Sequence, residues 1–226
     1  MSLSHEYFFN LSSFLHKDLF SSDISPWEVI KNLEKYLKTL SLGKIYGDIS
    51  DKAFLIDSES ISIGKGSIVE PGAYIQGPCV IGDNCVVRHG AYIRGNVLTG
   101  HSCVIGHDTE IKSSVLLDRS HAAHFAYLGN TILGNNVNLG AGVKCANFKL
   151  DHQTIHVYLD GKKVDTGLRK LGAIIGDNTQ IGCNSVTNPG TLIGKDVRCY
   201  PCLNAQGFIP SRSLIKPNFS NSISSY

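Results

Sequence analysis

Histidines and cysteines are the residues of this sequence with the greatest potential for chemistry. Four of the nine histidines fall within one short stretch: His101, His107, His121 and His124. An imidazole titrates near neutral pH, so it can serve as a general base or as a metal ligand. The seven cysteines include one CxxC pair, Cys199 and Cys202, which without a second pair is a weak zinc or redox signal. An odd number of cysteines in a chain of 226 residues favours a reducing compartment.

The elements that must position these side chains are indicated by a repeat of period six. Starting at Ile63, every sixth residue is aliphatic or threonine: Ile63, Val69, Ile75, Ile81, Val87, Ile93, Thr99, Ile105 and Ile111. Four residues after each of them stands a small or β-branched residue. An α-helix cannot produce this period, and a plain strand would show a period of two. The pattern predicts units of short strand plus corner, three to a triangular coil, with Ile63, Ile81 and Thr99 stacked in one interior column.

The same pattern predicts structural roles for most cysteines. Cys79, Cys85 and Cys103 occupy the small interior positions, where a buried cysteine acts as a small hydrophobic residue. Cys199 falls in an interior aliphatic column, which leaves Cys202 as a corner residue. We therefore interpret the CxxC pair as structural.

Interruptions of the repeat define the expected domains. The phase breaks after Ile111, resumes with Leu133 and disappears between Ala146 and Ala173. That last gap contains an Asp-Gly pair between alternating residues, which is typical of a β-hairpin. We expect a β-helix of seven to eight coils over residues 46–209, with a hairpin inserted at about 147–172.

The two ends of the chain lack the repeat. The stretch Ser25-Pro-Trp-Glu28 matches a helix capping box and precedes apolar residues at helical spacing. Residues 5–20 indicate a second, weaker helix, so we expect residues 1–45 to form a helical cap over the open end of the solenoid. The polar, Ser- and Asn-rich residues 210–226 are expected to form a mobile tail.

Composition excludes several classes of protein. The net charge is only +2, whereas a nucleic-acid-binding protein usually carries a strongly positive surface. The sequence contains no run of 18 apolar residues, so it does not predict a membrane span. Its first residues do not resemble a signal peptide. We therefore expect a cytoplasmic protein without a nucleic-acid or membrane partner.

Two stretches carry a resemblance to known enzymes. Residues from Glu110 to Phe148 resemble the acetyltransferase domain of the bifunctional glucosamine-1-phosphate N-acetyltransferase/N-acetylglucosamine-1-phosphate uridylyltransferases. Residues from Val164 to Asp177 are similar to archaeal-type sugar-1-phosphate nucleotidylyltransferase/acetyltransferases. This resemblance to hexapeptide-repeat acyltransferases implies an all-β, left-handed parallel β-helix and a homotrimer with active sites between neighbouring prisms. It implies acetyl-CoA as co-substrate, no metal, and direct transfer to an amino-sugar phosphate, with glucosamine-1-phosphate as the expected acceptor. Because residues 1–45 are too few for the relatives' nucleotidyltransferase domain, we expect that activity to be absent.

The resemblance also implies roles for individual residues that contact the acceptor. His124 falls on the family's general base, which takes a proton from the sugar ammonium group. Tyr127 and Asn138 fall on sugar and phosphate contacts. Cationic family positions that bind the phosphate fall on Arg88, Lys112 and Lys170.

A second set of positions corresponds to the cofactor end of the site. Asn147 falls on a family asparagine that orients the thioester, and Phe148 follows it as a cofactor-binding position. Here the sequence departs from the family, because Asn-Tyr-Asp-Gly is replaced by Asn147-Phe-Lys-Leu150. A family serine that contacts CoA is replaced by Cys183.

Two other functions remain open at this point. The changes at Phe148 and Leu150 are compatible with a non-catalytic trimeric scaffold, or with a module that binds sugar phosphates or nucleotide sugars. Some hexapeptide β-helices are zinc hydratases of the γ-carbonic anhydrase type, and His89, His101 and His107 fall on related outward positions. The spacing of His101 and His107 differs from that of the hydratase ligands, and the acidic partners are not evident.

Overall fold

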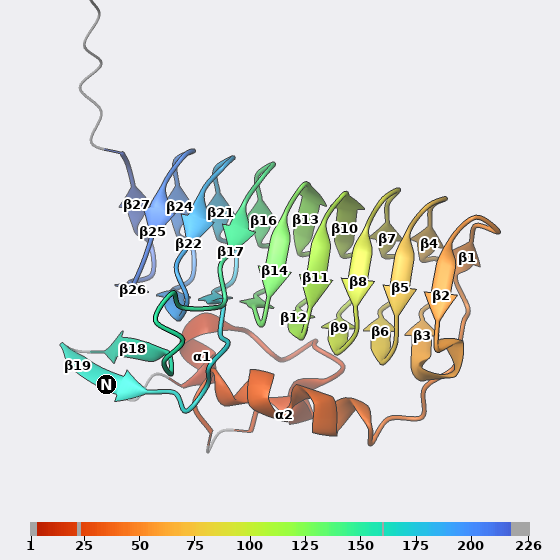
Figure 1. Ribbon diagram of the computed structural model, residues 1–226, viewed down its shortest axis with the longest axis horizontal. Coiled ribbons are helices and arrows are strands. Elements are labelled where there is room, and N and C mark those ends of the chain that lie inside the picture. The colour runs from red at the N-terminus through yellow and green to blue at the C-terminus, as the bar shows by residue number, and fades with distance from the viewer. Residues whose placement is uncertain (1–3, 22–23, 160, 218–226) are drawn as a thin grey trace, which may run out of the picture.

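The main feature of the molecule is a parallel β-helix with three flat walls, shown along its length in Figure 1. The structure is a computed structural model that describes residues 4–21, 24–159 and 161–217. Each coil passes through three sheets in the same order, here called sheet I, sheet II and sheet III, and the coils wind in a left-handed sense. The parallel β-helix that the hexad repeat predicts, and the left-handed sense that the family resemblance implies, are both confirmed.

The walls are built from strands of two to four residues. Sheet I contains β1 (Asp48–Ile49), β4 (Ile68–Val69), β7 (Val86–Val87), β10 (Val104–His107), β13 (His121–His124), β16 (Asn138–Leu139), β21 (Gln180–Ile181), β24 (Arg198–Cys199) and β27 (Leu214–Ile215). Sheet II contains β2 (Phe54–Ile56), β5 (Tyr74–Gln76), β8 (Tyr92–Arg94), β11 (Glu110–Lys112), β14 (Tyr127–Gly129), β17 (Lys144–Cys145), β22 (Val186–Thr187) and β25 (Asn204–Ala205). Sheet III contains β3 (Ile61–Ile63), β6 (Cys79–Ile81), β9 (Val97–Thr99), β12 (Ser114–Leu116), β15 (Ile132–Leu133), β20 (Ala173–Ile175), β23 (Thr191–Ile193) and β26 (Phe208–Ile209).

The interior of the prism is filled by the hexad residues in register. Ile63 pairs with Ile81, and Thr99 follows in the next coil, so the predicted column is confirmed. The repeat does not stop after Ile111, as the sequence suggested. It continues through the buried residues Leu116, Ala122 and Leu128 after one unit that is five residues long instead of six. A second five-residue unit runs from Leu128 to Leu133, so the break in phase marks two shortened units.

The β-helix extends further than predicted. Sheet I has nine strands among the described residues, so there is one coil more than the expected seven to eight. The last strand, β27, pairs with β24 and lies beyond residue 209, where we expected the tail to begin. The remainder of the predicted tail, residues 218–226, lies outside the described residues.

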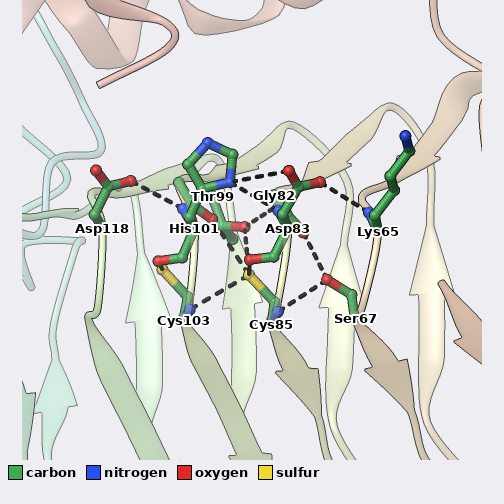
Figure 2. Close-up of polar contacts among 10 residues, drawn as sticks. Lys65, Ser67, Gly82, Asp83, Cys85, Thr99, His101, Cys103 and Asp118 are labelled. Atoms are coloured by element: carbon green, nitrogen blue, oxygen red, sulfur yellow. Dashed lines mark hydrogen bonds and ion pairs between the residues drawn. The ribbon is translucent and has the colours of Figure 1, made fainter. Parts of the chain in front are cut away.

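Polar ladders hold the corner between sheets III and I, as Figure 2 shows. At each step a side chain accepts a hydrogen bond from a backbone N–H one coil earlier. The Lys65 N–H donates to the Asp83 carboxylate, the Asp83 N–H to Nδ1 of His101, and the His101 N–H to the carboxylate of Asp118, at 2.8–2.9 Å. Gly82 is required at this corner, because a Cβ there would collide with the carbonyl oxygen of Gly100.

The N-terminal segment lies along the outer face of sheet III and not over the open end of the prism, contrary to our expectation of an end cap (Figure 1). It contains α1 (His5–Phe8), a 3-10 turn η1 (Lys17–Leu19) and α2 (Glu28–Leu37), so the longer helix predicted over residues 5–20 is wrong. The capping-box bond is present, since the Ser25 N–H donates to Glu28 at 2.7 Å. None of the described helices is long and apolar enough to cross a membrane. A further 3-10 turn, η2 (Ser58–Ser60), precedes β3.

The segment stays on sheet III because that sheet is apolar on both sides. The outward residues at the centres of its strands are buried under aromatic side chains of the N-terminal segment: Val80, Leu98, Val115, Ile132, Ile174 and Leu192. This second core stabilises the molecule through burial of apolar surface. A polar link adds to it, since Asp177 accepts hydrogen bonds from the N–H groups of Asn10 and Asn135, both at 2.7 Å.

The predicted hairpin is confirmed as β18 (His156–Leu159) and β19 (Lys162–Asp165), paired antiparallel. It emerges between β17 of sheet II and β20 of sheet III. Val157 and Val164 pair in register and join the second core, so one face of the hairpin packs on its own chain. The opposite face is free to line a groove.

Candidate active site

Three cationic side chains gather at the edge of sheet II next to the hairpin. Arg94 ends β8, and Lys112 ends β11 one coil later. Lys170 lies in the segment that returns from the hairpin to β20. Burial lowers the pKa of Lys112, the positive charges of Lys170 and Arg94 lower it further, and Glu110 partly offsets them. The three positive charges repel one another, so a bound anion such as a phosphate would stabilise this edge.

A pair of hydrogen-bonded side chains lies beside these cations. The Tyr127 hydroxyl donates to Oδ1 of Asn147 at 3.4 Å, and Nδ2 of Asn147 donates to Oδ1 of Asn130 at 2.7 Å. Asn147 is only 7% exposed, so its amide is held in one orientation. The pair depends on Gly129, because a Cβ there would collide with the Asn147 amide and lie 2.7 Å from the Tyr127 hydroxyl.

Glu110 orients the arginine of this edge. Its carboxylate forms an ion pair with Nη1 of Arg94 at 2.6 Å. Burial raises the pKa of the Tyr127 hydroxyl, and the negative charge of Glu110 raises it further. Tyr127 therefore stays protonated at neutral pH and can donate a hydrogen bond to a ligand. Arg94 and Glu110 are not among the site residues predicted from the sequence, although Arg94 directly follows an interior aliphatic residue one coil before Lys112.

Phe148 separates two hollows at the same edge. The smaller, about 580 Å³, is lined by Asn130 and Lys170, and the larger, about 940 Å³, lies under the hairpin. The Phe148 ring is 38% exposed, and Nζ of Lys170 lies 5.9 Å from its centroid. Leu150 is 99% exposed, so this departure from the family pattern leaves the packing of the site unaffected.

His124 lies at the opposite edge of sheet II. It ends β13, pairs in register with His107 and is exposed at the corner between sheets I and II. Among the described residues its imidazole makes no hydrogen bond or ion pair, which leaves it accessible. Cys183 is exposed at the same corner, two coils further along.

Two of the expected substrate contacts are not brought to the cationic edge. Asn138 lies on β16 of sheet I, between His121 and Gln180 in register. Arg88 follows β7, also in sheet I. In place of Arg88 the structure brings Arg94 next to Lys112. The three remaining predicted acceptor contacts, Lys112, Tyr127 and Lys170, lie at the same edge.

The three histidines of the zinc alternative do not converge within the chain. His89 and His107 stack at the corner between sheets I and II, with ring centroids 5.7 Å apart. His101 lies at the corner between sheets III and I, and its Nδ1 is occupied by the Asp83 N–H (Figure 2). Among residues 4–21, 24–159 and 161–217, no group of three His, Cys, Asp or Glu side chains could hold a metal ion.

Four of the five interior cysteines have the properties of structural residues, whereas hydrogen bonds, chiefly with Cys103, lower the pKa of the fifth, Cys85, to about 7. Cys79, Cys85 and Cys103 are buried in the prism, as predicted. Burial raises the pKa of Cys145 and of Cys199 to about 11, which keeps both thiols protonated and unreactive. Cys202 is an exposed corner residue with a left-handed backbone conformation, φ +60°.

Known proteins resemble this chain over its repeats. Residues 75–158 match the GMPPB C-terminal domain family, and residues 172–198 match the hexapeptide repeat of succinyl-transferase. A bifunctional sugar-1-phosphate nucleotidylyltransferase/acetyltransferase of Sulfurisphaera tokodaii is 38% identical over 85 residues, which cover 38% of this chain and 21% of the relative. The bifunctional protein GlmU of Methanococcus maripaludis is 31% identical over 171 residues, which cover 76% of this chain and 41% of the relative.

A solved structure supports the fold. The UDP-N-acetylglucosamine acyltransferase of Francisella novicida aligns with a TM-score of 0.50 at 14% identity, over 76% of this chain and 62% of that one. The chain spans less than half the length of the two curated relatives described above. Together with the β-helix, these matches identify the chain as a hexapeptide-repeat protein, similar over its repeat region to bifunctional sugar-1-phosphate acetyltransferases.

Proposed function

We propose that the protein is an acetyl-CoA-dependent N-acetyltransferase that acts on an amino-sugar phosphate, with glucosamine-1-phosphate as the expected acceptor. The observation that carries this proposal is that Arg94, Lys112 and Lys170 gather at the edge of sheet II that also carries the hydrogen-bonded pair Tyr127 and Asn147. The relative from Sulfurisphaera tokodaii supports it, because its name describes an acetyltransferase and a sugar 1-phosphate. As in our sequence analysis, the proposal includes a cytoplasmic homotrimer and no metal.

In this proposal the cationic edge holds the phosphate of the acceptor. Charge-assisted hydrogen bonds from a guanidinium and two ammonium groups suit a phosphate dianion. The Tyr127 hydroxyl and the Asn147 amide contact the sugar and orient the reacting groups. Asn147 is suited to this role, because Asn130 fixes the direction of its amide.

His124 is the proposed general base. It takes a proton from the sugar ammonium group, and the free amine then attacks the thioester carbonyl. A C–N bond forms, the C–S bond breaks, and the departing thiolate of CoA takes up a proton. His124 stands three residues before Tyr127, so their Cα atoms are at most about 10 Å apart. An acceptor lying along the outer face of sheet II can therefore present its amine towards His124 and its phosphate towards Lys112.

The experiment is to mix the protein with acetyl-CoA and glucosamine-1-phosphate and to measure the release of free thiol. We expect turnover that His124→Ala reduces by about 100-fold or more. His121→Ala is the matched control, because it removes an exposed imidazole from the same strand and should leave turnover unchanged. Binding of amino-sugar phosphates without turnover would contradict the proposal and favour a non-catalytic binding module.

A further inference from the structure

A cavity separate from the candidate active site lies where the N-terminal segment passes the corner between sheets III and I. Its volume is about 380 Å³, within the range of small-molecule sites. Three successive coils form one wall, at Gly64, Gly82 and Gly100, and the stretches on either side of α2 form the other. None of the described residues that line it belongs to sheet II. We call this hollow the corner cavity.

His101 carries a nitrogen that the corner itself does not need. The ladder requires one side-chain acceptor in each coil, and the short carboxylates of Asp118 and Asp177 supply it in other coils. His101 accepts the Asp83 N–H with Nδ1, so the proton of the neutral ring is on Nε2. Figure 2 shows this second nitrogen pointing away from the ladder. Among the described residues it has no hydrogen-bond partner, which leaves one N–H donor for a ligand in the cavity.

A second imidazole borders the cavity from the N-terminal segment. Nδ1 of His16 lies 3.0 Å from the Tyr36 hydroxyl, and His16 lines the same hollow as His101. Burial lowers the pKa of His16, and the positive charge of His101 lowers it further. An anion bound between the two rings would offset this repulsion.

The charged groups around the cavity also favour an anion. Lys44 lines it and adds an ammonium group to the two imidazoles. Asp83 is the one carboxylate among the described lining residues. It accepts the Lys65 N–H at 2.8 Å, and its other oxygen lies 3.8 Å from Nδ1 of His101, on the side of the ring away from Nε2. The donors that remain for a ligand therefore outnumber the acceptors.

The rest of the lining is apolar. Leu15, Leu40, Leu42 and Val80 face the same hollow. Leu15 is 69% exposed at its rim, although other apolar side chains lie beside it. A ligand with an apolar body would remove this surface from water, which is favourable through the hydrophobic effect.

We propose that the corner cavity binds a carboxylate that carries a short apolar chain. The carboxylate accepts hydrogen bonds from His101, His16 and Lys44, and the chain lies against Leu15 and Leu42. Such a ligand links the N-terminal segment to the prism, since the two walls of the cavity come from these two parts. Binding here does not depend on acetyl transfer at sheet II.

The test compares four small molecules that differ in charge or in chain length. Octanoate, octanamide, octylamine and acetate are titrated into the full chain at pH 7 by calorimetry. We expect octanoate to bind at least about ten-fold more tightly than octanamide, because charge-assisted hydrogen bonds are about twice as strong as neutral ones. It should exceed acetate by at least the same factor, because acetate lacks the apolar chain. Octylamine should bind more weakly still than octanamide, since its charge has the wrong sign.

Two pairs of variants locate the site. His101→Asn keeps a side-chain oxygen for the Asp83 N–H and removes the Nε2–H donor, so octanoate should bind about ten-fold more weakly. His107→Asn makes the same change at the corner between sheets I and II and should leave the affinity unchanged. Leu15→Ala alters an exposed position, so it does not threaten the fold, and should weaken octanoate by about ten-fold. Leu150→Ala, its control, should have no effect.

The remaining outcomes overturn the proposal. If octanamide binds as tightly as octanoate, the cavity does not recognise a carboxylate, and if octylamine binds most tightly, Asp83 selects a cation instead. If His101→Asn and His107→Asn weaken octanoate equally, binding takes place elsewhere on the molecule. Absence of octanoate binding at millimolar concentration also refutes the proposal, and none of these results bears on acetyl transfer.

Discussion

The hydroxyl of Tyr127 donates a hydrogen bond to the side-chain oxygen of Asn147, 20 residues further along the chain. The two residues lie on successive coils of the β-helix, so the stacking of coils brings them together. Asn130 fixes the far side of the Asn147 amide, and the cations Arg94, Lys112 and Lys170 lie at the same edge of the sheet. This contact is therefore a sensitive point at which to perturb the proposed site.

Replacement of Gly129 by alanine should disrupt the site without unfolding the protein. The added Cβ would collide with the Asn147 amide and crowd the Tyr127 hydroxyl, so both side chains must move. We expect kcat/KM for the acceptor to fall by more than ten-fold, with an unchanged circular dichroism spectrum. Tyr127→Phe removes the hydrogen bond without added bulk and should cause a smaller loss, of about three- to ten-fold. A Gly129→Ala protein with full activity would show that the Asn147 orientation is unimportant.

Lys112 should make phosphate binding sensitive to alkaline pH. Burial and the neighbouring cations lower its pKa below the usual 10.5, so it loses its charge earlier than an exposed lysine as the pH rises. The affinity for glucosamine-1-phosphate should therefore fall as the pH rises towards 10.5, over a range where the phosphate remains a dianion. Lys112→Arg should remove this decline, because a guanidinium stays charged throughout. The control Lys144→Arg changes an exposed lysine of the same sheet and should keep the wild-type profile. An affinity of the wild type that is constant over this range would contradict the assignment.

The outer core of sheet III should contribute strongly to stability. Leu98 is 0% exposed and lies beneath the N-terminal segment. Leu98→Ala should lower the free energy of unfolding by about 2–5 kcal/mol in urea denaturation. Leu150→Ala is the control, since Leu150 is 99% exposed, and should change the stability by less than about 0.5 kcal/mol. Equal effects of the two substitutions would mean that the N-terminal segment does not pack on sheet III in solution.

Asp177 should couple the attachment of the N-terminal segment to pH. Burial raises its pKa above 3.8, while its hydrogen bonds with Asn10 and Asn135 act in the opposite direction. The folded state then binds the proton more tightly than the unfolded state, so this contribution to stability is complete below about pH 3.8 and is lost as the pH rises through the raised pKa. Compared with Asp177→Asn, the wild type should lose stability across that window. Urea denaturation of both proteins between pH 4 and pH 7 measures the difference in their free energies of unfolding. If the wild type instead becomes more stable relative to Asp177→Asn as the pH rises, the assignment is refuted.

The repeat was readable from the sequence because each coil uses the same local rule. An aliphatic residue fills the interior at every sixth position, and this rule alone predicted the three-walled prism and the column of Ile63, Ile81 and Thr99. The hairpin was predicted for a similar local reason, its Asp-Gly turn. The two shortened units, from Ile111 to Leu116 and from Leu128 to Leu133, were not predicted, because a five-residue step shifts the phase without changing the fold.

Features that depend on contacts between distant segments were not predictable in this way. The position of the N-terminal segment depends on outward residues of sheet III such as Leu98 and Val115. The apolar face of a helix shows that the helix is packed against something, but it does not identify which surface it covers. The replacement of Arg88 by Arg94 at the cationic edge follows from the coil register, since Arg94 and Lys112 both follow paired interior isoleucines. The same register can be read from the sequence, whereas the family resemblance points to Arg88.

The most direct test of the proposed function compares kcat/KM for glucosamine-1-phosphate with kcat/KM for glucosamine, in the wild type and in Lys112→Ala. The account predicts that the wild type prefers the phosphorylated acceptor by about 100-fold or more, because its phosphate meets three cations, and that Lys112→Ala lowers this preference by about ten-fold. Equal kcat/KM values for the two acceptors in the wild type would contradict the central claim.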